Sequence, residues 1–137
     1  MLNILIFIIF YFTIIFSVLG YGYLVINFSK DKYISNDLGY IGLIGILFLI
    51  IISYISHFFV SHNYIFNSLI LIIGLFLFIF EILKDKKFLE KKNIKLLVLV
   101  FIILFLGIMM HKTHDDFPYY HFPYTYYLTQ SDIHIGV

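Results

Sequence analysis

Long apolar runs separated by short polar segments dominate the chain. The first run covers about residues 2–28 and ends in the polar stretch 29–32. The next apolar region, residues 38–80, contains no Asp, Glu, Lys or Arg over 43 residues. Because one membrane-spanning helix needs roughly 20 apolar residues, this region is long enough for two helices joined by a turn. Its polar dip, residues 61–64, is the predicted turn.

We therefore predict an all-α integral membrane protein with about four transmembrane helices. Backbone groups in lipid must form hydrogen bonds within their own segment, which favours helices over irregular structure. The fourth apolar segment is the shortest and spans the bilayer only with Lys95 extended to the interface. A re-entrant segment is the alternative there. The predicted spans are residues 2–28, 38–60, 65–83 and 94–110.

The amino-acid composition fits a chain that is surrounded mainly by lipid. The chain of 137 residues is 62% hydrophobic and 12% charged, whereas soluble domains are about 45–50% apolar and about 25% charged. The net charge of +1 gives no basic surface for nucleic acid. The absence of cysteine excludes disulfides, thiolate metal ligands and a cysteine nucleophile. The first 29 residues carry no charged side chain, so we interpret them as a span and not as a cleavable signal.

The lysines predict the orientation of the spans. Eight of the nine lie in or beside the loops that follow the first and third spans, and lysine-rich loops face the cytoplasm. We therefore expect a protein of the cell (inner) membrane with both termini extracytoplasmic. All six histidines then lie on the outer side.

Small and ionisable residues in the second span suggest helix packing. Gly39, Gly42 and Gly45 recur every three residues, a spacing that lets another helix approach closely. This face could bind a partner helix; a pore or hinge is the alternative. His57 is interpreted as a packed interfacial residue, and the alternative is a functional group paired with the aspartates described next.

Residues 111–137 form a His-, Asp- and Tyr-rich segment after the fourth span. A near-repeat, Phe-Pro-Tyr at 117–119 and 122–124, follows Asp115 and Asp116. Because proline is favoured only in the first turn of a helix, either aspartate could cap a short helix that begins at Phe117. The aromatic residues would lay this helix on the membrane surface.

Three interpretations of Asp115 and Asp116 remain open. They are cap and loop residues, or one is a general base whose pKa is raised by its neighbour and by the apolar interface, or both bind a divalent metal. The imidazoles available for that metal belong to His111, His114 and His121. Their spacing matches no compact metal-binding motif. No other cofactor is indicated.

The stretch 112–124, Lys-Thr-His-Asp-Asp-Phe-Pro-Tyr-Tyr-His-Phe-Pro-Tyr, resembles a segment of large bacterial multi-pass membrane proteins that are similar to GT-C membrane glycosyltransferases. The resemblance implies a polyprenyl-phosphate sugar donor, with Asp115 and Asp116 at the acidic positions and a surface helix from Tyr119. Lys112 or His114 would stabilise the departing lipid phosphate.

The chain departs from the GT-C pattern in two ways. In GT-C enzymes the acidic loop follows the first span, whereas here it follows the fourth, and those proteins have more spans. We therefore expect this sequence to be the N-terminal part of a longer protein. Whether it is an enzyme stays open, and the alternative is a non-enzymatic membrane subunit or scaffold.

Overall fold

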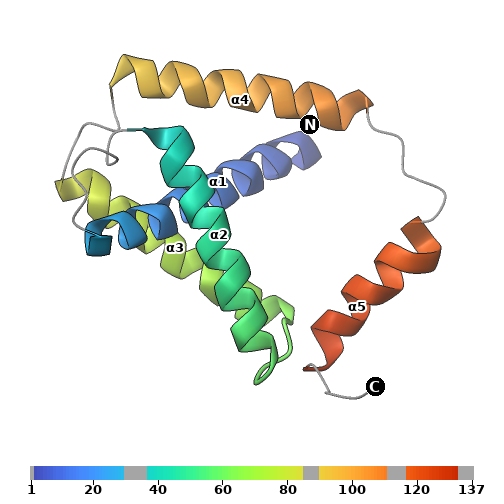
Figure 1. The fold of residues 1–137 in the computed structure, drawn as a ribbon. Helices are drawn as coiled ribbons and strands as arrows, with labels where there is room; N and C mark the ends of the chain where they lie inside the picture. The colour runs from blue at the N-terminus through green and yellow to red at the C-terminus, as the bar shows by residue number, and fades with distance from the viewer. Residues whose placement is uncertain (1, 30–36, 85–89, 111–116, 133–137) are drawn as a thin grey trace.

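The structure, a computed structural model, describes residues 2–29, 37–84, 90–110 and 117–132, which are helical apart from short turns. A π-helical turn (Phe117–His121) continues directly into the short helix α5 (Phe122–Gln130). The prediction of an all-α fold is confirmed for this part of the chain, which contains no β-strand. The four long helices before α5 are α1 (Leu2–Ser29), α2 (Leu38–His57), α3 (Tyr64–Lys84) and α4 (Lys91–Met110) (Figure 1).

Three of these helices are long and apolar enough to cross a membrane. The spanning segments are Leu5–Ser29, Leu38–His57 and Tyr64–Lys84, and their ends lie within three residues of the predicted ones. The fourth predicted span is a helix of 20 residues, α4. Three lysines occupy its first two turns, and its crossing of the membrane stays a prediction.

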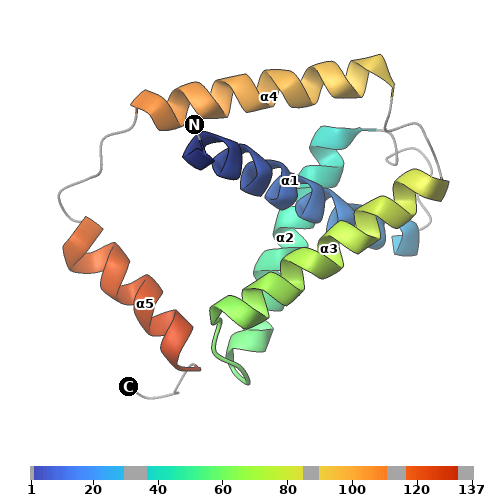
Figure 2. The same ribbon diagram turned by 180° about the vertical axis from the view of Figure 1, so that it is seen from behind.

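Helix α1 lies between α2 and α3 (Figures 1 and 2). Glycines make the two contacts close: a side chain on Gly20 would collide with the backbone of Gly74 in α3, and one on Gly45 with the backbone of Val18 in α1. In a membrane, where no hydrophobic effect drives helices together, such close backbone approach is the main source of van der Waals contact. The three-helix unit is therefore built around the middle of α1.

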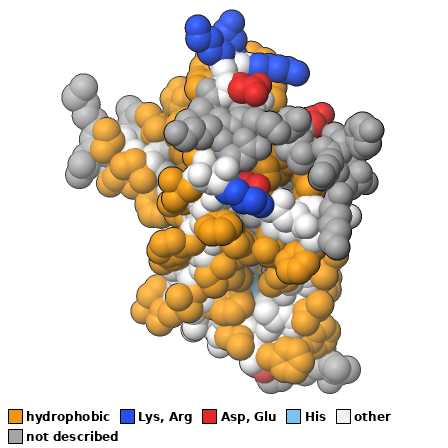
Figure 3. All heavy atoms as spheres, turned by 90° about the vertical axis from the view of Figure 1, so that its left-hand side faces the viewer, with side chains coloured by type: hydrophobic (Ala, Val, Ile, Leu, Met, Phe, Trp, Pro, Cys, Tyr) orange, Lys and Arg blue, Asp and Glu red, His pale blue; other side chains and the backbone are white. Residues whose placement is uncertain are grey.

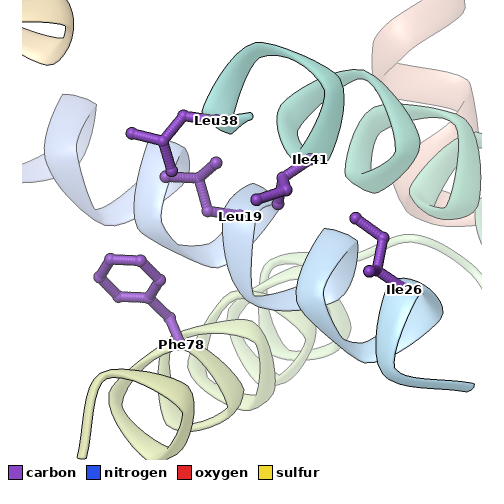
Figure 4. Close-up of a cluster of buried hydrophobic side chains, with 5 residues drawn as sticks. All are labelled: Leu19, Ile26, Leu38, Ile41 and Phe78. Carbon is purple, nitrogen blue, oxygen red and sulfur yellow. The ribbon is translucent and has the colours of Figure 1, made fainter. Parts of the chain in front are cut away.

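Buried aliphatic and aromatic side chains fill the space beside these glycines (Figure 4). Ile41 of α2 is fully buried and Phe78 of α3 is 3% exposed. The Phe78 ring stacks on Phe16 of α1, with ring centroids 4.8 Å apart and planes 8° from parallel. The core cluster consists of Leu19, Ile26, Leu38, Ile41 and Phe78.

The contacts define the directions of the helices. Gly22 lies against Ile41, whereas Gly45 lies against Val18, so α1 and α2 are antiparallel. Beyond the contact of Gly20 with Gly74, Asn27 donates a hydrogen bond of 2.9 Å to Glu81 at the C-terminal ends of both α1 and α3. Helices α1 and α3 therefore run in the same general direction. This is the direction expected for the first and third of three consecutive crossings of a bilayer.

Helix α4 contacts α1 through aromatic rings. Phe105 lies 6.2 Å from Phe7, and Phe101 lies 5.1 Å from Tyr11, between ring centroids. The order of these contacts makes α4 antiparallel to α1. Figure 1 shows α4 running across one end of the three-helix unit at a steep angle to α2.

Most apolar side chains of the spans point outward. Leu43 is 68% exposed and Phe76 is 67% exposed. Figure 3 shows hydrophobic side chains over most of one face, with lysine and acidic side chains mainly in its upper part. Contiguous apolar surface on this scale is rare on soluble monomers. The structure therefore fits contact with a lipid bilayer.

Candidate functional site

The sequence places candidate chemistry around residues 111–121. Of those residues the structure describes only the part from Phe117 onward. Asp115, Asp116, Lys112, His114 and His111 lie outside the described residues. Their assigned roles as base, supporting groups and metal ligands stay predictions.

The predicted short helix after the aspartates is present. It extends from Phe117, through the π-helical turn, to Gln130, with Pro123 in the first turn of α5. Pro118 lies in the first turn of the whole segment, where the N–H groups of a helix have no intrahelical acceptor. The first residue of α5 is preceded by His121, whose side chain makes no capping hydrogen bond.

The aromatic side chains of this short helical segment are all exposed. None of its residues is buried, and Tyr119 is 76% exposed. Phenol rings with an apolar body and a polar hydroxyl are favoured at the membrane–water interface. The exposed aromatic residues are Phe117, Tyr119, Tyr120, Phe122, Tyr124, Tyr126 and Tyr127.

His121, the third predicted metal ligand, lies at the end of the π-helical turn and is exposed. Its ring stacks loosely on Phe117, with ring centroids 6.5 Å apart. Within the described ranges, no group of three or more His, Asp or Glu side chains is arranged to hold a metal ion. The described residues therefore add no ligand partner to His121.

A different polar cluster lies where α2 ends. His57, the last residue of α2, is 4% exposed, and its ring centroid is 4.6 Å from that of His62 in the turn that follows. The Ser56 hydroxyl lies 3.0 Å from His62 Nε2, and the Ser53 hydroxyl lies 3.4 Å from His62 Nδ1. We call His57, His62, Ser53 and Ser56 the histidine cluster.

The turn between α2 and α3 is held by side-chain hydrogen bonds. Asn63 accepts a bond of 3.0 Å from the Phe66 amide, and the Asn67 side chain donates one of 2.8 Å to the His62 carbonyl. The bond to Asn63 satisfies an amide that the first turn of α3 leaves unpaired, and the bond from Asn67 ties the His62 carbonyl to the start of α3. The connection between α2 and α3 covers residues 58–63, so it overlaps the predicted turn at 61–64 but begins three residues earlier.

The turn also contacts α5. The His62 backbone N–H donates a hydrogen bond of 3.1 Å to the carbonyl of Leu128, in the last turn of α5. That carbonyl is one of the four that a helix C-terminus leaves without an intrahelical donor. The histidine cluster and the exposed aromatic helix thus lie at the same end of the molecule (Figure 1).

The environment of His62 disfavours its charged form. Burial lowers the pKa of the His62 imidazole, and the neighbouring His57 lowers it further. Desolvation and a like charge both penalise an imidazolium. His62 is therefore neutral over a wider pH range than a histidine in water.

The sequence did not identify His62 as the neighbour of His57. It suggested the aspartate pair instead, which lies outside the described residues. A signal for this contact was present in the sequence. His57 and His62 are five residues apart, and the predicted turn between them brings the chain back to the end of α2. The two serines, on the same face of α2, complete the cluster.

Of the three glycines on the predicted face of α2, only Gly45 lies against the backbone of another helix of this chain. Gly45 contacts the backbone of α1, whereas the nearest side-chain atom to a Cβ on Gly42 would be Leu19 Cδ2, at 3.9 Å. A Cβ on Gly39 would meet the capping carboxylate of Asp37. The sequence missed the more important close contacts, which belong to Gly20, Gly22 and Gly74.

Comparison with known proteins adds no relative. No protein-family model matches the chain, and neither a curated protein nor a solved structure matches it.

Proposed function

We propose that this chain is part of a multi-pass membrane enzyme of the GT-C type, which transfers a sugar from a polyprenyl-phosphate donor at the extracytoplasmic surface. The observation that carries the proposal is the exposed aromatic helix that begins at Phe117, directly after the two aspartates in sequence. A surface helix after an acidic pair is the arrangement that the resemblance to GT-C enzymes implies.

The proposed chemistry assigns Asp115 or Asp116 as general base toward an acceptor hydroxyl. The bond from the anomeric carbon to the donor phosphate breaks as the acceptor oxygen attacks, and the lipid phosphate leaves as an anion. Lys112 or His114 would stabilise that anion electrostatically. A divalent metal held by the aspartates with His111, His114 or His121 would serve the same purpose.

The distribution of lysines along the chain supports an extracytoplasmic location for α5. Lysines concentrate in the sequence segments after α1 and α3, and the directions of α1 and α3 put the C-terminal ends of these two helices at the same end of the three-helix unit. By the preference of lysine for the cytoplasmic side, α5 then lies on the outside. An outer-face site is where lipid-linked sugar donors would meet exported acceptors.

The test is to replace Asp115 and Asp116 by Asn in the intact gene and to measure surface glycan. Loss of a general base costs about 100- to 10,000-fold in rate, so we expect loss of the glycan at unchanged protein level. The matched control is Glu90→Gln, an exposed acid before α4 at the opposite end. Unchanged glycan in the double Asn variant contradicts the proposal.

The second candidate is a non-enzymatic membrane subunit that docks on the glycine face of α2. Gly42 favours it, because a Cβ there would meet only one side-chain atom of the chain, Leu19 Cδ2, at 3.9 Å. The candidate predicts that Gly42→Leu disrupts a complex isolated in mild detergent, while the aspartates are dispensable. Gly107→Leu is the control, since a Cβ there meets no atom within 4 Å. A complex that survives Gly42→Leu eliminates this candidate.

A further inference from the structure

A groove on the lipid-facing surface of the three-helix unit runs along α2 beside α1. Its volume is about 500 Å³. Ile46 and Ile50 in its floor are exposed, so the groove opens sideways toward the bilayer. Its side chains are mainly apolar, and Ser53 brings a hydroxyl to one end. The lining residues are Val18, Ile46, Leu49, Ile50, Ser53 and Tyr54.

The histidine cluster continues the same face of α2. The groove uses positions 46, 49, 50, 53 and 54 of this helix, and His57 follows one turn later. Residues at this spacing share one face of a helix. Ser53 belongs to both features, because it lines the groove and its hydroxyl lies 3.4 Å from His62 Nδ1. The groove therefore has an apolar length and a polar end.

The length of this face matches one leaflet of a bilayer. Ile46 lies near the middle of α2, and His57 is the last residue of that helix. At about 1.5 Å per residue, the helix between them is roughly 16 Å long. That is about half of the ~30 Å hydrocarbon core of a membrane. The groove therefore has the reach of one lipid chain whose head lies at the membrane surface beside the histidine cluster.

The polar end leaves hydrogen-bonding groups unused. His57 is 4% exposed, and neither of its ring nitrogens has a hydrogen-bond partner among the described residues. A neutral imidazole carries one donor and one acceptor, and a buried polar group without a partner is costly. A ligand hydroxyl both donates and accepts, so it can pair with either nitrogen.

The charges around the histidine cluster favour an uncharged ligand head. Burial and the neighbouring His57 lower the pKa of the His62 imidazole, which favours its neutral form. The described lysines lie in α3 and α4 at the opposite end of the molecule, with Lys84 the last residue of α3. A phosphate head would lose water there without gaining a described cationic partner.

We propose that the groove and the histidine cluster together bind a single-chain lipid with an uncharged hydroxyl head, of the monoacylglycerol class. The acyl chain lies along α2 from Ile46 to Tyr54, and the head hydroxyls bond to His57 and Ser53. The lipid enters sideways from the bilayer. This site uses none of the residues assigned to sugar transfer, so it does not rest on that proposal.

The experiment is photocrosslinking of the full chain in phosphatidylcholine nanodiscs. The probe is a monoacylglycerol with a diazirine in its acyl chain, and mass spectrometry locates the adducts. We expect adducts on the groove residues of α2 and on Val18 of α1, and their loss when unlabelled monoacylglycerol is added in excess. Adducts spread evenly over the exposed apolar residues of α2 and α3, as bulk lipid would give, overturn the proposal.

Two competitors test the head of the lipid. The methyl ester of the same fatty acid has the chain without a hydroxyl, and lysophosphatidic acid has the chain with an anionic phosphate. Loss of a hydrogen bond weakens binding up to about tenfold, so we expect both lipids to compete less well than monoacylglycerol, by about tenfold. Equal or stronger competition by either lipid overturns the assignment of an uncharged hydroxyl head.

Two substitutions at the same depth in α2 test the position of the chain. Ile50→Trp fills the groove from an exposed position, and we expect labelling to fall to the level seen with excess competitor. Ile51→Trp is the matched control, because Ile51 is also exposed but lies outside the groove. It should label as the parent does. Equal labelling of the two variants overturns the proposal.

A third variant tests the contribution of the histidine cluster. His57→Phe keeps a buried ring and removes both ring nitrogens, so we expect monoacylglycerol to lose most of its advantage over the methyl ester. A full advantage in this variant overturns the assignment of the head to His57. Circular dichroism checks the helix content, and the comparison of Ile50→Trp with Ile51→Trp decides the proposal if His57→Phe does not fold.

Discussion

Gly74 shows how much of this fold depends on single residues without a side chain. It lies in α3 against the Ser17 side chain and backbone and the ring of Tyr21 in α1. Tyr21 in turn donates a hydrogen bond of 2.8 Å from its hydroxyl to the Ile70 carbonyl, which fixes the rotation of α1 against α3. Both contacts need the helix backbones to be close, and glycine allows this.

We predict that Gly74→Leu separates α1 from α3. Overpacking usually costs about 1–3 kcal/mol, and here the added atoms meet backbone that cannot move alone. Thermal unfolding in detergent should show the loss. Gly107→Leu introduces the same side chain into open space in α4 and leaves the unfolding temperature unchanged. Equal stability of the two variants would show that the α1–α3 contact is not close in solution.

Capping residues set the element boundaries more sharply than hydropathy does. The Asp37 carboxylate accepts hydrogen bonds from the amides of Gly39, at 2.9 Å, and Tyr40, at 3.4 Å, and so begins α2. Asn63 acts similarly at the start of α3. These hydrogen bonds give the first amides of the two helices an acceptor, which the hydrocarbon of a bilayer could not supply.

We predict that Asp37→Ala frays the start of α2. The loss of a capping side chain costs about 1 kcal/mol, so amide hydrogens at Gly39 and Tyr40 should exchange faster with deuterium. The conservative Asp37→Asn change retains an acceptor oxygen and should preserve the protection. Faster exchange in the Asn variant as well would show that charge, and not hydrogen bonding, stabilises this end.

At the scale of the whole molecule, the distribution of polar groups gives two unlike ends. Lys84 and the lysines at the start of α4 lie at one end, and the histidine cluster and α5 lie at the other. Such an asymmetry favours one orientation in the membrane.

We predict that single cysteines at Val60 and Glu90 react from opposite sides of the membrane. Both residues are exposed. A membrane-impermeant maleimide added to intact cells should label the Val60→Cys variant and should reach the Glu90→Cys variant only after permeabilisation. The reverse pattern would place α5 and the aspartates in the cytoplasm and exclude an extracytoplasmic transferase.

The sequence by itself determined the class of the fold and the extent of its helices. Apolar runs of spanning length, broken at residues 29–37, 61–64 and 84–93, leave the backbone no alternative to helix in lipid, and each run is one helix. The short helix at Phe117 was also predictable, because proline and aromatic residues act locally. Neither result needed knowledge of which helices touch.

Only the tertiary structure decided which small and polar residues meet. Gly39, Gly42 and Gly45 share a spacing, yet only Gly45 lies against another helix backbone, because the crossing point depends on the shape of α1 as well as α2. His57 and His62 are brought together by the direction of the turn, and His62 meets Leu128 by the docking of α5. A periodic pattern records the faces of one helix, whereas contacts between helices depend on two surfaces at once.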